Sequence, residues 1–238
     1  MNKRFLFLTI LLITALGLIS YKITHAFFSD TASSTGNIFA ASTLFPTPSL
    51  TPTPTITITP SPTPTPSIAN NLVINEVYYD PDSDHIQGGG PNPDENDFEW
   101  IEIYNPTGST VNLQNWKIQD NSATERTVTT SNRDLAAGDF VILAKAANVR
   151  TLWGIAEDKF IPIGENFGNG LANDGDRVIL KNNLGTTIDV MSYGDDTSQL
   201  NPSETDVVEG HSLEREPDGV DTNTNADFVD RTIPTPGS

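Results

Sequence analysis

The chain has 238 residues and no cysteine, which excludes disulfide bonds, thiolate zinc sites and a cysteine nucleophile. It carries 31 acidic and 13 basic residues, a net charge of −18. Binding to nucleic acid or to an anionic membrane surface is not expected, because phosphate groups are recognised by clustered Lys and Arg.

Residues 1–26 have the order of a secretory signal peptide. "MNKR" is a basic start, the run from Phe5 to Ser20 is apolar, and Thr24 and Ala26 fit a small-residue cleavage site. Cleavage after Ala26 predicts a secreted or cell-surface protein. The apolar run approaches the length of a membrane span, so the alternative is an uncleaved N-terminal segment that anchors the chain in the membrane.

Residues 27–44 form a short segment after the predicted cleavage site, and residues 45–69 form a Pro/Thr-rich linker. The stretch "AFFSDTASSTGNIFAASTL" resembles the first mature residues of camelysin-type and biofilm-matrix surface proteins, which favours cleavage near Ala26. Alternation of Pro with Thr or Ser excludes an α-helix and the hydrogen bonding of a β-sheet, and it favours an extended polyproline II spacer. We interpret the linker as an inert spacer. O-glycosylation of its hydroxyls and a role as a proline-rich ligand are the alternatives.

Residues 70–238 are predicted to form one domain that is rich in β-strands. Its apolar or alternating runs are "NLVINEVYY", "FEWIEIYN", "VNL", "WKIQD", "DFVILAK", "DRVILKN", "TTIDVMSY" and "HSLERE", separated by turn residues. Only "AANVRTLWG" is predicted to be helical. Many short strands without alternating helices predict an all-β sandwich rather than a parallel α/β sheet.

The order of these runs resembles the lamin-tail domain. The matching segments are "VINEV" (73–77), "EWIEIYNPTGSTVNLQNWKIQD" (99–120), "LAAGDFVILA" (135–144), "GNGLANDGDRVILKNNLGTTIDVMSYG" (168–194) and "HSLEREPDGVDT" (211–222). The resemblance implies an all-β, immunoglobulin-like β-sandwich without enzymatic activity, of the kind found in nuclear lamins and in many secreted bacterial proteins. The acidic segments 80–97 and 195–210 depart from the family pattern and are predicted to be surface loops.

Lamin copies of this domain are linked to nuclear partners and DNA. Lys3, Arg4, Lys22 and Asp30 lie ahead of Asn70, so the remaining domain carries a net charge of −20. A charge of that sign and size makes the nuclear role implausible for this chain. The expected partner is an unknown protein or glycan on a surface, and not nucleic acid.

The stretch "FEWIEIYN" contains two glutamates that either form a catalytic pair or belong to a strand. Strand alternation places Trp100 and Glu102 on one face and Glu99 on the other, so the two carboxylates cannot converge on one substrate. Glu102 is expected to be partly buried and to pair with Arg215, because an unpaired buried charge is very costly. Glu99 is expected to lie near the strand's start, in solvent.

Calcium is the cofactor that the acidic loops favour most. Asp80, Asp82 and Asp84 have an alternating spacing, Asp94 and Asp97 follow closely, and calcium binds six to eight oxygens. A second run places Asp221, Asn223, Asn225 and Asp227 at alternate positions. The EF-hand pattern fails, since His85 stands where Gly is required. The alternative is that these loops are solvated and that their Asx residues form turns.

Nucleophilic catalysis is not expected. Ser192, Ser212, His85 and His211 are present, but no GxSxG motif accompanies them. Trp100 and Trp116 are expected to be buried aromatic side chains rather than carbohydrate platforms. The sequence therefore predicts a non-catalytic binding or adhesion module. The alternatives are a calcium-assisted extracellular hydrolase and a structural envelope or matrix protein.

Overall fold

A computed structural model describes residues 68–86 and 93–238. The expected signal peptide, the segment 27–44, nearly all of the linker and the centre of the first acidic loop lie outside the described residues. Within the part of the chain that the structure describes, no helix is long and apolar enough to cross a membrane.

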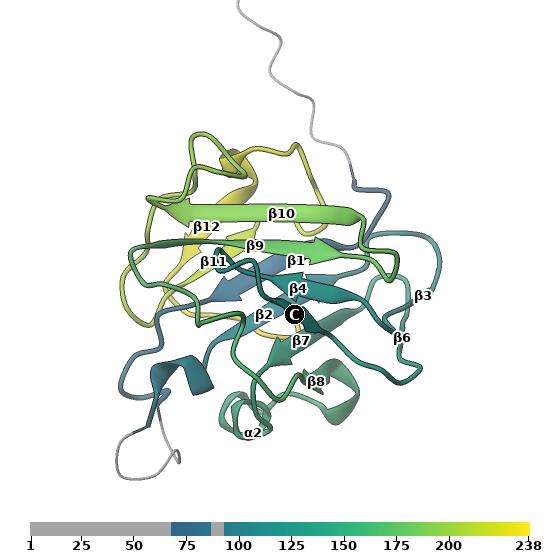
Figure 1. The fold of residues 1–238 in the computed structure, drawn as a ribbon, viewed down its shortest axis with the longest axis horizontal. Coiled ribbons are helices and arrows are strands. Elements are labelled where there is room, and N and C mark those ends of the chain that lie inside the picture. The colour runs from purple at the N-terminus through teal and green to yellow at the C-terminus, as the bar shows by residue number, and fades with distance from the viewer. Residues whose placement is uncertain (1–67, 87–92) are drawn as a thin grey trace, which may run out of the picture. The chain divides into compact units, whose positions relative to one another are not determined.

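The described residues form an all-β fold in which two larger sheets pack face to face (Figure 1). One sheet has the strand order β12-β11-β1-β2-β7-β8, the second β10-β9-β4-β5, and a small third sheet pairs β3 with β6. The strands are β1 (Val73–Tyr78), β2 (Trp100–Tyr104), β3 (Val111–Asn112), β4 (Lys117–Gln119), β5 (Glu125–Thr127), β6 (Asp134–Leu135), β7 (Phe140–Ala144), β8 (Phe160–Pro162), β9 (Gly175–Lys181), β10 (Thr187–Gly194), β11 (Ser212–Arg215) and β12 (Phe228–Arg231). The helices are η1 (Glu95–Asp97), α2 (Asn148–Trp153), η2 (Glu157–Lys159) and η3 (Asn225–Asp227).

The main hydrophobic core lies between the two larger sheets. Strand β1 contributes Ile74 and Val77 to it, strand β2 contributes Ile101 and Ile103, and Trp116, at 7% exposure, packs into the same core. Because side chains alternate along each strand, the other half of β1 and β2 faces outward from the sandwich. The expected immunoglobulin-like β-sandwich is confirmed.

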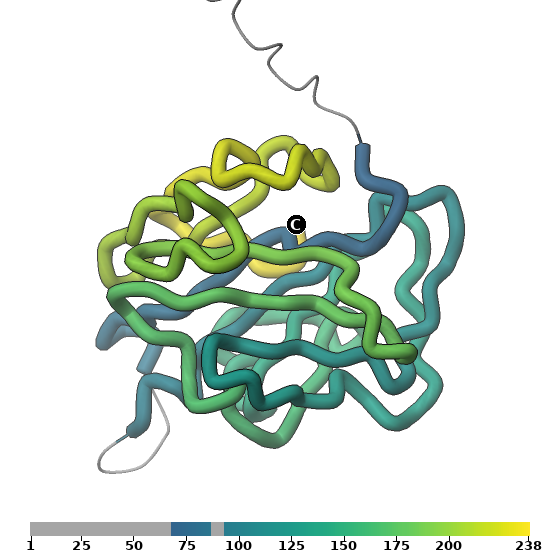
Figure 2. Tube along the Cα trace, turned by 45° about the horizontal axis from the view of Figure 1, so that its top comes forward, coloured from purple at the N-terminus to yellow at the C-terminus, as the bar shows by residue number. Residues whose placement is uncertain are grey.

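The outer face of the six-stranded sheet is also covered. Around β2, β7 and β8 it carries a second apolar cluster that includes Trp100, Ile142 and Phe160, and α2 closes this cluster with Val149. Trp100 is fully buried there and stacks on Tyr78 at 5.6 Å between ring centroids. Around β1 and β11 the cover is the C-terminal segment 232–238, which returns past β1 in Figure 2.

Every strand predicted from the sequence is present, as is the short helix α2. Four further strands were not predicted: β5, β6, β8 and β12. Strand β8 pairs with β7 in parallel, whereas the other strand pairs of the two larger sheets are antiparallel. Strands β1, β2 and β11 also carry buried polar residues, some on the outer face of the sheet and some between the two sheets.

Candidate functional site

A row of three glutamates crosses the outer face of the six-stranded sheet. Glu76 of β1 is the direct cross-strand partner of Glu214 on β11 and of Glu102 on β2. Neighbouring strands lie about 4.8 Å apart, so three carboxylates stand side by side. Glu76 and Glu102 are fully buried, and Glu214 is 6% exposed.

An irregularity in β1 adds an amide to this row. The pairing of β1 with β2 shifts between Ile74 and Glu76, so Asn75 has no partner residue on β2. Such a bulge turns two successive side chains toward one face. The Nδ2 atom of Asn75 donates to Glu102 Oε1 at 3.0 Å and to Asp218 Oδ1 at 3.3 Å.

The C-terminal segment and Ser212 of β11 supply further donors to the two buried carboxylates. The amide of Thr235 donates to Glu76 Oε1 at 3.0 Å, and the hydroxyl of Ser212 donates to the same oxygen at 2.5 Å. The amide of Gly237 donates to Glu102 Oε2 at 2.5 Å. Lys159 Nζ donates to the carbonyl oxygen of Gly237 at 2.7 Å and fixes the segment from its other side.

Burial changes the acidity of this pair. Removal from water raises the pKa of Glu76 to about 7 and that of Glu102 to about 8. The hydrogen bonds from Ser212 and Thr235 to Glu76, and from Gly237 to Glu102, oppose the rise. Glu76 also repels Glu102 and adds to the rise in the pKa of Glu102, and Glu214 does the same for Glu76. The pKa values of both buried carboxyl groups are therefore raised to neutral pH or above.

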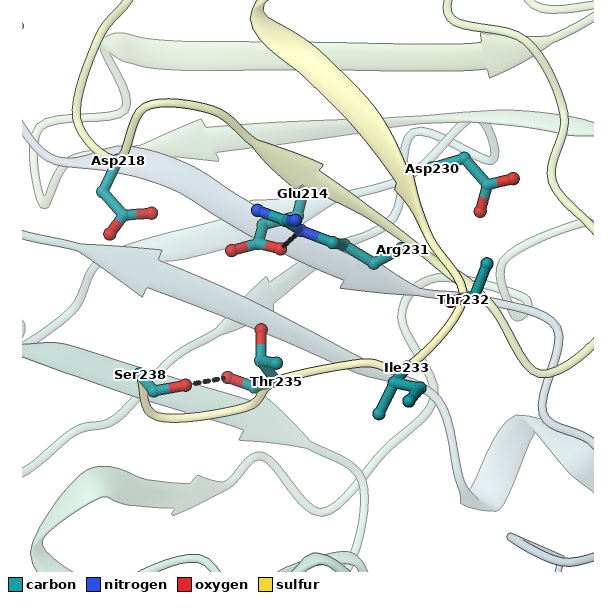
Figure 3. Close-up of a pocket in the computed structure, with 8 residues that line it drawn as sticks. All are labelled: Glu214, Asp218, Asp230, Arg231, Thr232, Ile233, Thr235 and Ser238. Carbon is teal, nitrogen blue, oxygen red and sulfur yellow. Dashed lines mark hydrogen bonds and ion pairs between the residues drawn. The ribbon is translucent and has the colours of Figure 1, made fainter.

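An open, polar groove of about 540 Å³ lies beside this pair (Figure 3). It is lined by Glu214, Asp218, Asp230, Arg231, Thr232, Ile233, Thr235 and Ser238. Glu214 and Arg231 form an ion pair in the middle of the groove, and Asp218 and Asp230 lie on either side of that pair in Figure 3. The groove therefore presents the exposed carboxylates of Asp218 and Asp230, while the charges of Glu214 and Arg231 neutralise each other between them.

The expected pairing of Glu102 with Arg215 is wrong. Strand β11 turns Glu214 outward, so the adjacent Arg215 points to the opposite face, between the sheets. Glu102 and Arg215 thus lie on opposite faces of one sheet. Glu102 is buried as expected, but its partners are the Asn75 amide and the backbone of Gly237.

Arg215 is the centre of a separate buried ion network. Its guanidinium is 2.9 Å from Asp189 of β10, 3.2 Å from Asp227 and 3.4 Å from Asp221. It also donates to the carbonyl oxygen of Ile74 at 3.0 Å. The alternating acids of the run 221–227 are therefore used to hold Arg215.

The expectation that Glu99 lies in solvent is also wrong. Glu99 is fully buried, and its Oε1 accepts the amide of Leu171 at 2.9 Å. The loop around Gly170 closes over this carboxylate, and burial raises the pKa of Glu99 well above its usual value. Glu99 directly precedes β2 and binds the loop at Leu171, whereas Glu102 of β2 binds the C-terminal segment, so the two form no acid–base pair.

Comparison with models of known protein families identifies the family of this chain. The sequence model of the Lamin Tail Domain family matches residues 65–195, more than half of the chain. The chain belongs to the lamin tail domain family. A search of curated proteins finds no match. In this lamin tail domain the matched region ends just after β10, so β11, β12, the groove and the C-terminal segment all lie beyond it.

The five carboxylates expected to bind calcium do not come together as one group in the described part of this lamin tail domain. Asp80 accepts a hydrogen bond from Asn173 at 2.7 Å, Asp82 contacts His85 at 2.5 Å, and Asp97 pairs with Lys145. Asp94 caps η1, and Asp84 is exposed. Within residues 68–86 and 93–238, no three acidic or histidine side chains are grouped so that they could hold a metal ion.

The residues considered for nucleophilic catalysis are also separated. Ser212 points outward to Glu76, whereas the adjacent His211 binds Asp230 at 2.8 Å. Ser192 accepts the amide of Leu200 at 2.9 Å, and His85 stacks on Trp153. Each of these side chains is engaged in holding its own strand or loop.

The Glu76–Glu102 pair was missed by the sequence reasoning, although a signal was present. The segments "VINEV" and "WIEI" each carry one glutamate within an otherwise apolar strand. Two such strands that pair as neighbours bring the two carboxylates together when the register matches. The bulge at Asn75, which sets that register, has no signature in the sequence.

Proposed function

We propose that this chain is an exported, non-catalytic lamin tail domain protein that binds a cationic surface ligand through the groove between β11, β12 and the C-terminal segment. The groove of about 540 Å³, with Asp218 and Asp230 exposed beside the self-neutralised Glu214–Arg231 pair, is the observation that carries this proposal. A net charge of −18 would attract basic ligands and repel acidic ones. The signal-like N-terminus and the Pro/Thr linker support display outside the cell.

The burial of the glutamates argues against the hydrolase alternative. Glycoside hydrolysis requires two carboxyl groups about 5–10 Å apart that both reach the substrate. Glu76 and Glu102 are neighbours, but the amides of Thr235 and Gly237 cover them. Glu99 directly precedes β2 and lies beneath the loop at Leu171.

Binding of a short oligolysine peptide to the full chain at low and high salt tests the proposal. We expect the double substitution Asp218→Asn with Asp230→Asn to weaken binding at least several-fold, because it removes the groove's exposed charges. The matched control is Asp84→Asn with Asp174→Asn, two exposed acids outside the groove. Equal weakening by both double substitutions would show that only the overall charge attracts the peptide, and would reject the groove.

A further inference from the structure

Strand β12 forms one edge of the six-stranded sheet, and the backbone groups along its free side are unpaired. The amide of Glu216 donates to the carbonyl oxygen of Asp227 at 2.9 Å, which fixes the phase of the hydrogen bonds between β11 and β12. Because these bonds alternate along an antiparallel pair, the backbone groups of Asp230 and Thr232 face away from β11. Both residues are exposed, and neither amide has an acceptor among the described residues.

The other edges of the two larger sheets are occupied or short. On the free side of β8, the amide of Phe160 donates to the carbonyl oxygen of Glu157, and Pro162 has no N–H. On β10, the carbonyl oxygen of Ser192 accepts the amide of Glu204 at 2.9 Å. Strand β5 is three residues long. An edge with unpaired N–H and C=O groups is a template for a further strand, and β12 is the edge best suited to accept one.

The groove of the proposed function runs along this edge. Its wall includes the four consecutive residues Asp230, Arg231, Thr232 and Ile233, of which Ile233 is 75% exposed. In Figure 3 the side chains of Asp230 and Arg231 leave β12 on opposite sides. The Asp230 side chain is 49% exposed, whereas Arg231 is held by Glu214. A ligand beside β12 therefore meets an accessible carboxylate.

An extended polypeptide has the groups that this edge can pair with. Its alternate N–H and C=O groups complete the row at Asp230 and Thr232, and its side chains lie directly opposite those of β12. Opposite charges attract across a strand pair, so the residue opposite Asp230 is expected to be Lys or Arg. A second copy that paired through the same edge would set one acidic edge against another, which is unfavourable.

We propose that β12 is a strand-addition site that accepts a basic segment of another protein in extended conformation, with Lys or Arg opposite Asp230. This inference rests on the proposed function, which places a cationic ligand in the groove. It names that ligand as a polypeptide whose backbone is recognised, as distinct from a free amine or a cationic glycan. The added strand can run parallel or antiparallel to β12, since both directions use the same backbone groups of Asp230 and Thr232.

Binding of the peptide acetyl-Val-Thr-Lys-Thr-Val-amide to the full chain tests the backbone recognition. Two matched peptides carry N-methyl groups, one on the Lys amide and the other on both Thr amides. A strand presents alternate amides to one neighbour, so one methylated peptide should bind about tenfold more weakly and the other about as well as the parent peptide. Which of the two is weakened gives the direction of the added strand.

Equal binding of all three peptides would show that the groove recognises charge alone and would reject strand addition. Equal weakening by both methylated peptides, or no binding of the parent peptide at millimolar concentration, would reject it as well. The oligolysine experiment with the Asp218 and Asp230 substitutions decides the proposed function separately, because it does not depend on which peptide amides are free.

Hydrogen exchange at single amides gives a second readout on the full chain. We expect the bound peptide to slow exchange at Asp230 and Thr232, and to leave Val229 and Arg231, which face β11, unchanged. A peptide that binds without slowing exchange at Asp230 and Thr232 would not lie along the edge, and the assignment would fail. Protection of these two amides that grows with chain concentration in the absence of peptide would show that a second copy occupies the edge, and would overturn the proposal too.

Discussion

Among the residues that the structure describes, Arg215 is the one buried cation, and three carboxylates surround it. Replacing Arg215 by Met keeps much of the side chain's volume but leaves Asp189 and Asp227 buried without a cation. We expect the free energy of unfolding to fall by about 3–5 kcal/mol in chemical denaturation. The control is Lys117→Met, which breaks the partly exposed pair with Glu125 and should cost at most about 1 kcal/mol. Similar losses for the two substitutions would contradict a central role for Arg215.

Substitutions of Glu99 test whether its buried carboxyl group stabilises the fold as a hydrogen-bond acceptor rather than as a charge. Glu99→Ala should cost about 1–3 kcal/mol in chemical denaturation at pH 7, because the amide of Leu171 loses its acceptor. Glu99→Gln should cost clearly less, since glutamine keeps an acceptor oxygen and resembles the protonated form that the raised pKa favours. The idea fails if Glu99→Ala unfolds like the parent chain.

Strands β11 and β12 are the elements that complete the sandwich beyond the region matched to the family. β11 pairs with β1 and carries Arg215, and β12 pairs with β11. A chain that ends at Asp195 would expose the edge of β1 and leave Asp189 without its cation. We expect it to show no cooperative unfolding by circular dichroism, whereas residues 65–238 should unfold cooperatively. A cooperative transition in the shorter chain would contradict this dependence.

Most elements found from the sequence have long apolar or alternating runs, such as β2, β7, β9 and β10. The short strands β3 and β4 were found because turn residues flank them. The missed strands β5, β6 and β8 are two or three residues long, too short to show a period of two. β12, "FVDR", is polar at its end and follows an Asx-rich run that favours turns. The candidate site was missed for a different reason. Glu76, Glu102 and Thr235 are far apart in the chain, and strand register and the bulge at Asn75 bring them together.

For the whole molecule, the pH dependence of stability is set by which acidic groups are buried more than by the total charge. Most of the acidic side chains are exposed or paired, but Glu76 and Glu102 are buried beside each other, with pKa values raised to about 7 and about 8. Glu99 shows the same direction, and burial raises the pKa of Asp189 to about 6 despite the nearby Arg215. These groups hold protons in the folded state that the unfolded chain releases at about pH 4 to 4.5.

Stability should therefore fall as pH rises. Between pH 4.5 and pH 8 the folded state binds more protons than the unfolded state, so the free energy of unfolding decreases as the pH rises through this range. From pH 6 to pH 9 we expect Glu76 and Glu102 to account for a loss on the order of 2–4 kcal/mol. Chemical denaturation of the parent chain at the two pH values measures the total loss.

Matched double substitutions assign that loss to the buried pair. In Glu76→Gln with Glu102→Gln, both side chains stay neutral at every pH, so the difference in unfolding free energy between pH 6 and pH 9 should shrink markedly. Asp84→Asn with Asp174→Asn removes the same net charge from exposed positions and should leave the parent's difference unchanged. If both double variants keep the parent's pH dependence, the loss does not come from the buried pair. If both reduce it equally, general repulsion among the acidic groups is the cause, and the raised pKa values of Glu76 and Glu102 are not what limits stability at high pH.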